Sequence, residues 1–374
     1  MSSASSFRDC FKPVSFSQLN GWQEDDHLAA FCCFKVSALA MIEAAPKTKS
    51  PLKTKSLGIS TTDLLAVGKK AITCSIQTIA EARLFFENNF CLFQYSDPAE
   101  SGFLTGYFEP EVAASRVKTT RFKYPIYQRP NDLVELDSNN RPATIDADYV
   151  FGRQTSNGIV EYFDRGEIQD GALDGQNLEL FWLDDPVDLY HIHIQGSARL
   201  SFVDGSHTRI SYAAKSGHPY TSIGSILVKS GEMSLKDITM QSIKAWLYQN
   251  SSRRSEILGK NRSFIFFRTA DEWNNNSGPI GAAGVSLTSE RSLAIDHKLY
   301  SFGLPFWVET FDNFVDSDHR LKKLLIAQDT GSAIVGTLRG DYFVGSGVEA
   351  GRIAGQIKHR ATLRVLVPNP AQGL

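Results

Sequence analysis

Two aspartates near the C-terminus are the residues of this sequence best suited to acid chemistry. Asp329 and Asp341 lie twelve positions apart, each with a glycine within two residues, with apolar residues before the first and aromatic residues after the second. Carboxyl groups at the ends of short strands can act as general acids, and glycines let a large ligand approach the backbone. The pattern indicates acid catalysis on a polymer. Turn residues are an open alternative, because aspartate beside glycine is common in turns.

Asp329 also begins a short motif known from aspartic proteases. Asp329-Thr-Gly-Ser follows an apolar run, and the chemistry of these proteases needs two such carboxylates that share one proton. The chain holds no second Asp-Thr-Gly or Asp-Ser-Gly. A two-lobed protease is therefore excluded, and a dimeric protease with one motif per chain stays open, although such chains are normally much shorter.

Length and composition indicate an ordinary globular protein. The 374 residues predict two domains, or one domain with a large insert. A net charge of −2 with 21% charged residues gives no general nucleic-acid footprint. We see no apolar run long enough to span a bilayer and no secretory signal in the first residues. We therefore expect either a cytoplasmic protein or one whose export signal is not in this sequence.

We expect no metal site, disulfide framework or other cofactor. His191 and His193 alternate on an expected strand without a third ligand, which favours a structural role. The glycine-rich residues 278–284 lack the lysine of a phosphate loop and are interpreted as a turn. The odd number of cysteines, without Cys-x-x-Cys, predicts buried apolar residues or free thiols at Cys10, Cys32, Cys33, Cys74 and Cys91.

The periodicity changes along the chain from helical to strand-like. Residues 21–42, 61–70 and 78–89 have helical spacing. Another helix is expected to begin at Ser234, with Asp237 in capping-box register. Strands at high density with glycine-rich connections favour a barrel over a doubly wound sheet. Strand-like runs occupy residues 105–110, 121–127, 178–183, 187–196, 263–268, 305–310, 323–329 and 362–367.

Four blocks, taken in order, resemble the membrane-bound lytic murein transglycosylase A family. They cover roughly residues 15–367, and their joint order is far more specific than any one alone. The blocks are Thr105-Gly-Tyr-Phe-Glu-Pro-Glu-Val with Tyr124-Pro-Ile-Tyr, then His193-Ile-Gln-Gly-Ser-Ala, then Tyr220-Thr-Ser-Ile-Gly, and a C-terminal three-aspartate region with Asp296, Asp329 and Asp341. The chain departs from the family at Ser286, where proline is usual, and in showing no lipoprotein signal.

The resemblance implies a mainly β fold with N-terminal helices. Residues 1–105 and 256–374 would form a double-psi β-barrel domain, residues 106–255 an inserted β-barrel-like domain, and a saccharide groove would lie between them. The catalytic acid of the family falls on Asp341, with Asp329 and Asp296 as supporting carboxylates. Substrate contacts are expected from the matched blocks, at Tyr107, Glu109, Gln195 and Ser197, and from Tyr342 beside the acid.

The resemblance also implies the reaction, its partners and its location. Such enzymes cut the β-1,4 bond between N-acetylmuramic acid and N-acetylglucosamine without water, leaving a 1,6-anhydro end. One residue can act as acid and then as base, because the C6 hydroxyl of the substrate is the nucleophile. The expected partners are peptidoglycan strands and cell-wall synthesis or turnover proteins, in a Gram-negative periplasm with outer-membrane attachment. A hydrolytic endoglycosidase using Asp329 and Asp341, or a glycan-binding module without activity, are the alternatives.

Overall fold

The computed structural model describes residues 10–44, 61–96, 101–270, 277–315 and 317–370. The chain divides into two compact units. The first comprises Met1–Phe108, Asn276–Gly345 and Gln356–Leu374, and the second comprises Glu109–Asn275 and Ser346–Gly355. The expected boundary at residue 255 falls inside the second unit, since strand β12 (Ile265–Thr269) pairs with β11 (His207–Lys215) there.

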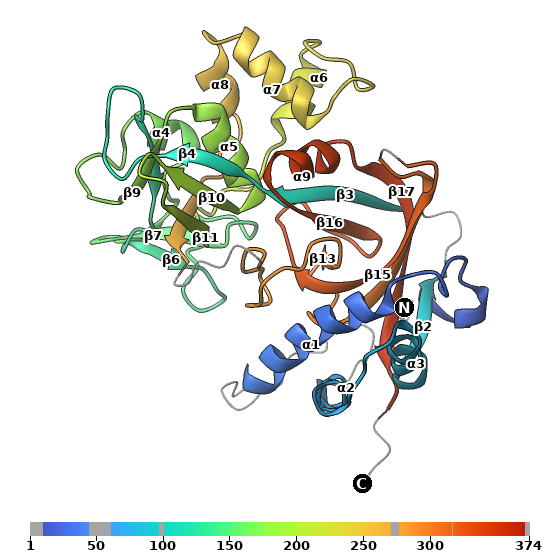
Figure 1. Cartoon of the computed structure of the whole chain (residues 1–374). Coiled ribbons are helices and arrows are strands. Elements are labelled where there is room, and N and C mark those ends of the chain that lie inside the picture. Colours follow the sequence, from blue (N-terminus) through green and yellow to red (C-terminus); the bar gives the residue numbers. More distant parts are fainter. Residues whose placement is uncertain (1–9, 45–60, 97–100, 271–276, 316, 371–374) are drawn as a thin grey trace, which may run out of the picture. The chain divides into compact units, whose positions relative to one another are not determined.

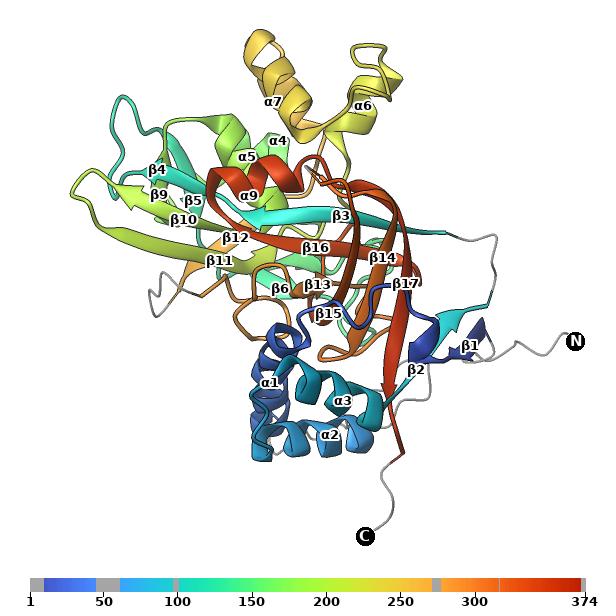
Figure 2. The ribbon, with the colours of Figure 1, turned by 45° about the vertical axis from the view of Figure 1, so that its right-hand side comes forward.

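The first unit is built on a closed ring of six strands. The strand order β17-β14-β15-β13-β16-β3 is closed by pairing of β17 with β3, and β1 and β2 extend the sheet from β17 (Figures 1 and 2). The strands are β1 (Phe11–Val14), β2 (Phe90–Tyr95), β3 (Gly102–Glu109), β13 (Ser292–Ala294), β14 (Pro305–Asn313), β15 (Arg320–Asp329), β16 (Arg339–Ser346) and β17 (Lys358–Pro368).

Near-continuous apolar runs allow ring strands β14 and β15 to be buried over much of their length. Trp307 and Val308 on β14 and Leu324 on β15 have no exposed side-chain surface. β-Branched and aromatic residues fit a pleated surface, and a strand covered on both faces needs apolar residues at successive positions. The expected mainly β fold with N-terminal helices is confirmed.

Three helices pack on one side of the ring (Figure 2). They are α1 (His27–Ala44), α2 (Thr61–Thr73) and α3 (Ile79–Asn89), and a short 3-10 turn, η2 (Phe16–Gln18), precedes them in the chain. The capping box of Thr78 and Glu81 that starts α3 is confirmed. By length and composition α1 could cross a membrane, contrary to the expectation from sequence, but Phe31 and Phe34 pack against Phe86 in the core.

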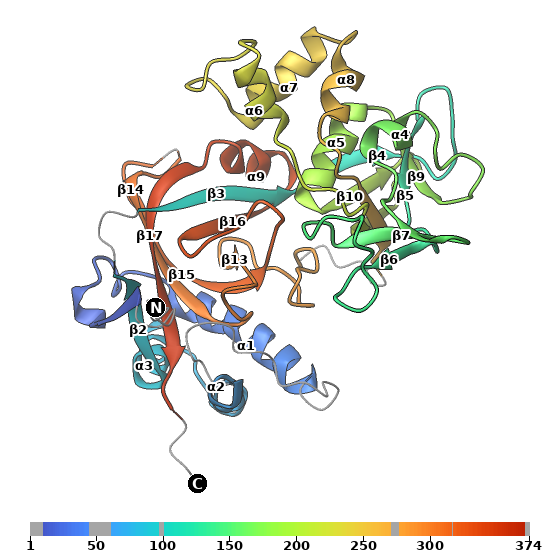
Figure 3. The same ribbon diagram turned by 180° about the vertical axis from the view of Figure 1, so that it is seen from behind.

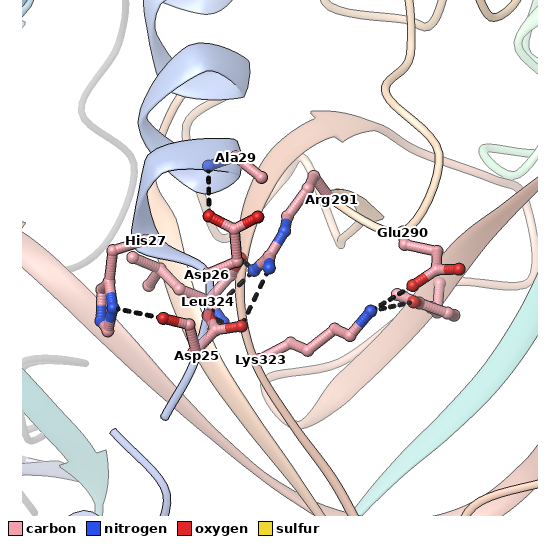
Figure 4. A network of polar contacts seen from close by, with 9 residues as sticks. Asp25, Asp26, His27, Ala29, Glu290, Arg291, Lys323 and Leu324 are labelled. Carbon is pink, nitrogen blue, oxygen red and sulfur yellow. Dashed lines mark hydrogen bonds and ion pairs between the residues drawn. The ribbon is translucent and has the colours of Figure 1, made fainter. Parts of the chain in front are cut away.

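A buried ion pair attaches the helical segment to the barrel (Figure 4). Asp25 makes two hydrogen bonds of 2.9 Å with the guanidinium of Arg291, and also accepts from the backbone N–H of Leu324 at 2.8 Å. The next residue, Asp26, accepts from the N–H of Ala29 and so caps the first turn of α1. The start of α1 is thereby fixed to β15, the strand that ends in Asp329.

The second unit contains a four-stranded sheet in the order β12-β11-β10-β4, two small sheets and several short helices (Figure 3). Its remaining strands are β4 (Glu111–Ala114), β5 (Tyr124–Tyr127), β6 (Leu133–Glu135), β7 (Phe151–Thr155), β8 (Gly158–Val160), β9 (Glu179–Leu183) and β10 (Ser197–Phe202). Its helices are α4 (Arg165–Gln169), α5 (Pro186–Gln195), α6 (Ile223–Lys229), α7 (Met240–Gln249), α8 (Arg254–Gly259) and α9 (Gly347–Ala354).

Two expectations for this unit are wrong. The expected strand at 187–196 is helix α5, which is capped by Asp185, has Pro186 in its first turn and ends at Gly196 in the left-handed conformation with φ of 78°. The helix expected to begin at Ser234 begins instead at Met240, because Thr239 supplies the cap.

Candidate active site

The barrel places Asp329 and Asp341 at the same register position of its sheet, on the two strands that flank β13. Ala294 of β13 is the register partner of Asp341 on β16 and also of Asp329 on β15. Residues paired across neighbouring strands project from the same face, and two strand spacings amount to about 10 Å between the outer backbones. The two carboxyl groups therefore flank Ala294 on one face.

A β-bulge at Gln328 sets the direction of Asp329. The register steps from Leu293 paired with Ala327 to Ala294 paired with Asp329, which leaves Gln328 as the extra residue. Its fully buried side chain donates to Ser37 at 2.8 Å on α1 and accepts from Ser292 at 2.5 Å. Bulges re-aim side chains beside active sites, and this one is held in place by a polar network.

Three donors hold the carboxylate of Asp329. Oδ1 accepts from the backbone N–H groups of Ala282 and Thr330, both at 2.9 Å, and Oδ2 accepts from the Tyr107 hydroxyl at 3.0 Å. Burial raises the pKa of Asp329, and these hydrogen bonds oppose that rise. The Ala282 donor depends on Gly281, where a Cβ would lie 2.7 Å from the carbonyl oxygen of Gln328. The turn expected at 278–284 thus serves as a cradle for Asp329.

Asp341 lies in a different environment from Asp329. Its Oδ1 accepts from the Thr105 hydroxyl at 2.6 Å, while Arg339 donates to that same hydroxyl at 2.7 Å. Burial raises the pKa of Asp341 to about 6, against the lowering effects of the Thr105 hydrogen bond and the Arg339 charge, and the Asp329 charge adds to the rise. Asp341 nevertheless keeps some accessible surface, as a group that meets a ligand must.

A hydrophobic cluster lies beside the two carboxyl groups. Tyr107, Leu287, Ala294, Ile334 and Phe343 form one buried cluster, in which the rings of Tyr107 and Phe343 lie 5.2 Å apart. Burial and the charges of both aspartates raise the pKa of Tyr107 well above its usual value, so its hydroxyl stays protonated and donates to Asp329. Low local polarity is what keeps a carboxylic acid protonated near neutral pH.

Asp296 and Tyr342, the other site residues expected in the first unit, make contacts that stabilise the fold. Asp296 is buried and accepts from the N–H groups of Lys298 and Gly336, so it organises two turns. Tyr342 follows Asp341 and therefore projects from the opposite face of β16. It is 1% exposed and packs against Phe314. A ring in this position offers no face to a sugar.

The remaining three expected substrate contacts belong to the second unit. Glu109 is fully buried and accepts from Arg199 at 2.8 Å, Arg209 at 2.5 Å and the Ser346 hydroxyl at 2.7 Å, which is a structural ion cluster. Ser197 is 6% exposed at the start of β10, and Gln195 is partly exposed at the end of α5. Of the three, Gln195 has the most accessible surface.

Sequence reasoning missed Thr105, Arg339 and the backbone of Ala282. Thr105 lies in a matched block, two residues before Tyr107, and Arg339 lies two residues before Asp341. Period-two spacing places each pair on one face of its strand, so alternation was a usable signal. The contact of Ala282 with Asp329 spans 47 positions and has no local signal.

Comparisons with known proteins found matches over most of the chain. A family model described as the MltA specific insert domain matches residues 103–268, and one described as the 3D domain matches residues 291–367. A membrane-bound lytic murein transglycosylase of Agrobacterium tumefaciens is 39% identical, with a TM-score of 0.88 over 96% of this chain and 97% of that one. MltA of Neisseria gonorrhoeae is 34% identical, with a TM-score of 0.76 over 97% and 93%.

A curated relative supports the same assignment. Membrane-bound lytic murein transglycosylase A of Escherichia coli K12 is 31% identical over 275 residues, which are 72% of this chain and 66% of that protein. The matched part is thus just under two thirds of that relative's length. Together with the full-length structural match, these similarities show that the chain belongs to the membrane-bound lytic murein transglycosylase A family.

Proposed function

We propose that this member of the lytic murein transglycosylase A family cleaves peptidoglycan with one essential carboxyl group, that of Asp341. The bond cut is the β-1,4 link between N-acetylmuramic acid and N-acetylglucosamine, and the product carries a 1,6-anhydro ring. The observation that carries the proposal is a partly accessible aspartate whose Oδ1 accepts the Thr105 hydroxyl and whose pKa is raised by burial to about 6. An ordinary aspartate, with a pKa near 3.9, is almost wholly ionised at neutral pH and cannot donate a proton.

The proposed reaction needs a single proton carrier. Asp341 gives its proton to the glycosidic oxygen as the bond to the anomeric carbon breaks, and the electron pair stays on the leaving oxygen. The carboxylate then takes the proton of the C6 hydroxyl, while the C6 oxygen bonds to the anomeric carbon. Because the nucleophile belongs to the substrate, proximity favours ring closure.

The surroundings of Asp329 favour this reaction over hydrolysis. A hydrolase needs a second carboxylate that activates water or attacks the sugar. Both oxygens of Asp329 are already engaged, since Oδ1 accepts two backbone N–H groups and Oδ2 accepts the Tyr107 hydroxyl. Such a carboxylate is suited to supplying negative charge beside Asp341 and poorly suited to binding a nucleophilic water. We therefore assign Asp329 a supporting role.

The finer features of the family are also part of the proposal. The six-stranded ring closed by β17 and β3 supports a double-psi barrel. A glycan contact is proposed for Gln195, which is partly exposed in a matched block. We propose that the protein acts in a Gram-negative periplasm with outer-membrane association, where its substrate lies, and fractionation of the source cell tests this. Native protein found solely in the cytoplasm would contradict wall cleavage.

Product analysis of digested sacculi tests the function. Purified sacculi are incubated with the wild type, with Asp341→Asn and with Asp312→Asn, an exposed aspartate of the same unit as a matched control. We expect anhydro-muropeptides from the wild type and the control, and release slower by about 10²–10⁴-fold from Asp341→Asn. Products one water heavier would indicate a hydrolase. Binding of sacculi without any release would indicate a glycan-binding module.

A further inference from the structure

The hydroxyl beside Asp341 has a defined direction. Arg339 Nη2 lies 2.7 Å from Thr105 Oγ1, and Thr105 Oγ1 lies 2.6 Å from Asp341 Oδ1. A guanidinium only donates hydrogen bonds, so it occupies a lone pair of the threonine oxygen. The one hydrogen of the hydroxyl then points at Oδ1 of Asp341. A chain of two hydrogen bonds thus runs from arginine through threonine to the aspartate.

Arg339 is itself anchored to the strands that carry this chain. Its Nη1 donates to the carbonyl oxygens of Phe103 and Gly340, and its guanidinium lies 5.4 Å from the centre of the Phe103 ring. Arg339 and Asp341 are two residues apart on β16, and Thr105 lies on the adjacent strand β3. The guanidinium is held by backbone groups on both strands, so it cannot rotate freely away from Thr105.

We propose that Thr105, oriented by Arg339, is a positioning residue that keeps Oδ1 of Asp341 occupied and so presents Oδ2 as the oxygen that donates the proton. This inference rests on the proposed role of Asp341 as the acid. An oxygen that accepts a strong hydrogen bond is the poorer site for the proton, which therefore sits on the other oxygen. Fixing the donor oxygen in advance aligns it with the glycosidic bond.

The same chain serves the second half of the reaction. Once Oδ2 has given its proton to the leaving oxygen, the carboxylate must persist until the C6 hydroxyl returns a proton. A charge-assisted hydrogen bond from Thr105 and the nearby Arg339 charge both stabilise that anion. Both lower the pKa of Asp341, opposite to burial and to the charge of Asp329. Tyr107, whose pKa is raised well above its usual value by burial and by the charges of both aspartates, stays neutral.

Variants at Thr105 separate positioning from packing. Thr105→Val keeps the shape and removes the hydroxyl, and Thr105→Ser keeps the hydroxyl and removes a methyl group. For Thr105→Val we expect kcat to fall about tenfold to a hundredfold with little change in KM, as for loss of a hydrogen bond to a charged group. The alkaline limb of its pH profile should move to higher pH, because a stabiliser of the carboxylate is lost. Thr105→Ser should restore both properties.

Arg339→Met tests the direction of the chain. If Arg339 acts through Thr105, the double variant should be no slower than the slower single variant, and the alkaline limb of Arg339→Met should also move to higher pH. Fully additive losses would overturn the proposal. So would an unmoved or lowered limb in Thr105→Val, or a Thr105→Ser enzyme as slow as Thr105→Val.

A direct titration keeps the test independent of turnover and of the proposed function. The carboxyl carbon of Asp341, followed by carbon-13 NMR in the free protein, should titrate at higher pH in Thr105→Val than in the wild type, and at the wild-type pH in Thr105→Ser. Equal titration in all three proteins would refute the positioning role. Asp341→Asn is assayed in parallel: if it retains activity, the acid assignment fails, whatever the titration gives.

Discussion

The pH dependence of cleavage tests the acid assignment most sharply. kcat/KM reports the ionisation of the free enzyme, in which the pKa of Asp341 is about 6. For such a group the protonated fraction is about 0.9 at pH 5, about 0.1 at pH 7 and about 0.01 at pH 8. We therefore expect the initial rate of sacculus solubilisation at limiting substrate to fall about fivefold from pH 6 to pH 7 and about tenfold per pH unit above pH 7.

Removal of the neighbouring charge should move this limb in a known direction. Asp329→Asn keeps the shape and deletes the negative charge, so ionisation of Asp341 becomes easier and its pKa falls. At a separation of about 10 Å, two charges interact by roughly 0.4 kcal/mol in water and roughly 1.7 kcal/mol at an effective dielectric constant of 20. The limb should therefore move down by about 0.3 to 1.2 pH units.

The assay compares full pH profiles rather than single rates. Asp312→Asn, an exposed aspartate in the same unit, serves as the control and should leave the profile unchanged. The reasoning fails if the wild-type limb lies near pH 4, since Asp341 would then be an ordinary carboxyl. An Asp329→Asn limb at the wild-type position would show that burial alone raises the pKa of Asp341. A limb displaced upward would contradict the electrostatic sign.

Three further predictions concern the acid, the ion pair and the cradle. Asp341→Asn should lower kcat by about 10²–10⁴-fold in muropeptide release while sacculus binding persists, and a smaller loss would place the acid elsewhere. Arg291→Leu strands Asp25 in a buried site, so urea denaturation should show a loss of about 3–5 kcal/mol in the free energy of unfolding; an unchanged midpoint would refute this. Gly281→Ala places a Cβ against the carbonyl of Gln328, so kcat should fall as the loop withdraws its N–H from Asp329, and wild-type kcat would contradict the cradle.

Strand alternation explains what could and could not be foreseen around the acid. The apolar run before Asp329 predicted the strand at residues 323–329, whereas the strand that carries Asp341 was not among the predicted runs; the barrel pairs both aspartates with Ala294. The same alternation argues against Tyr342 as a ligand contact, because adjacent residues of a strand point to opposite faces. Proximity in sequence to Asp341 suggested otherwise, and the buried ring shows that strand geometry is the better guide.

Non-local partners account for the expectations that sequence could not settle. A carboxylate such as that of Glu109 can bind a glycan. Its ion-pair partners Arg199 and Arg209, however, lie 90 and 100 positions away in the sequence, so they could not be foreseen from nearby residues. The strand predicted at residues 187–196 rests on their alternation in polarity, but Pro186 in the first turn and Gly196 at the end are ordinary helix signals, and the segment is helix α5. For α7, Thr239 forms the capping box with Ser242, whereas the Ser234 hydroxyl accepts from the N–H of Lys236 in the turn before the helix.

Hydrogen-bond supply, more than distance, distinguishes the two aspartates. Both pair in register with Ala294, and burial raises the pKa of each. Among the residues that the structure describes, Asp329 receives three donors that engage both oxygens, whereas Asp341 receives the Thr105 hydroxyl at Oδ1. Two like carboxyl groups in unlike surroundings take different roles. Asp341 keeps Oδ2 for the substrate and can therefore exchange a proton with it. Asp329 has both oxygens engaged, so it can hold a negative charge beside Asp341.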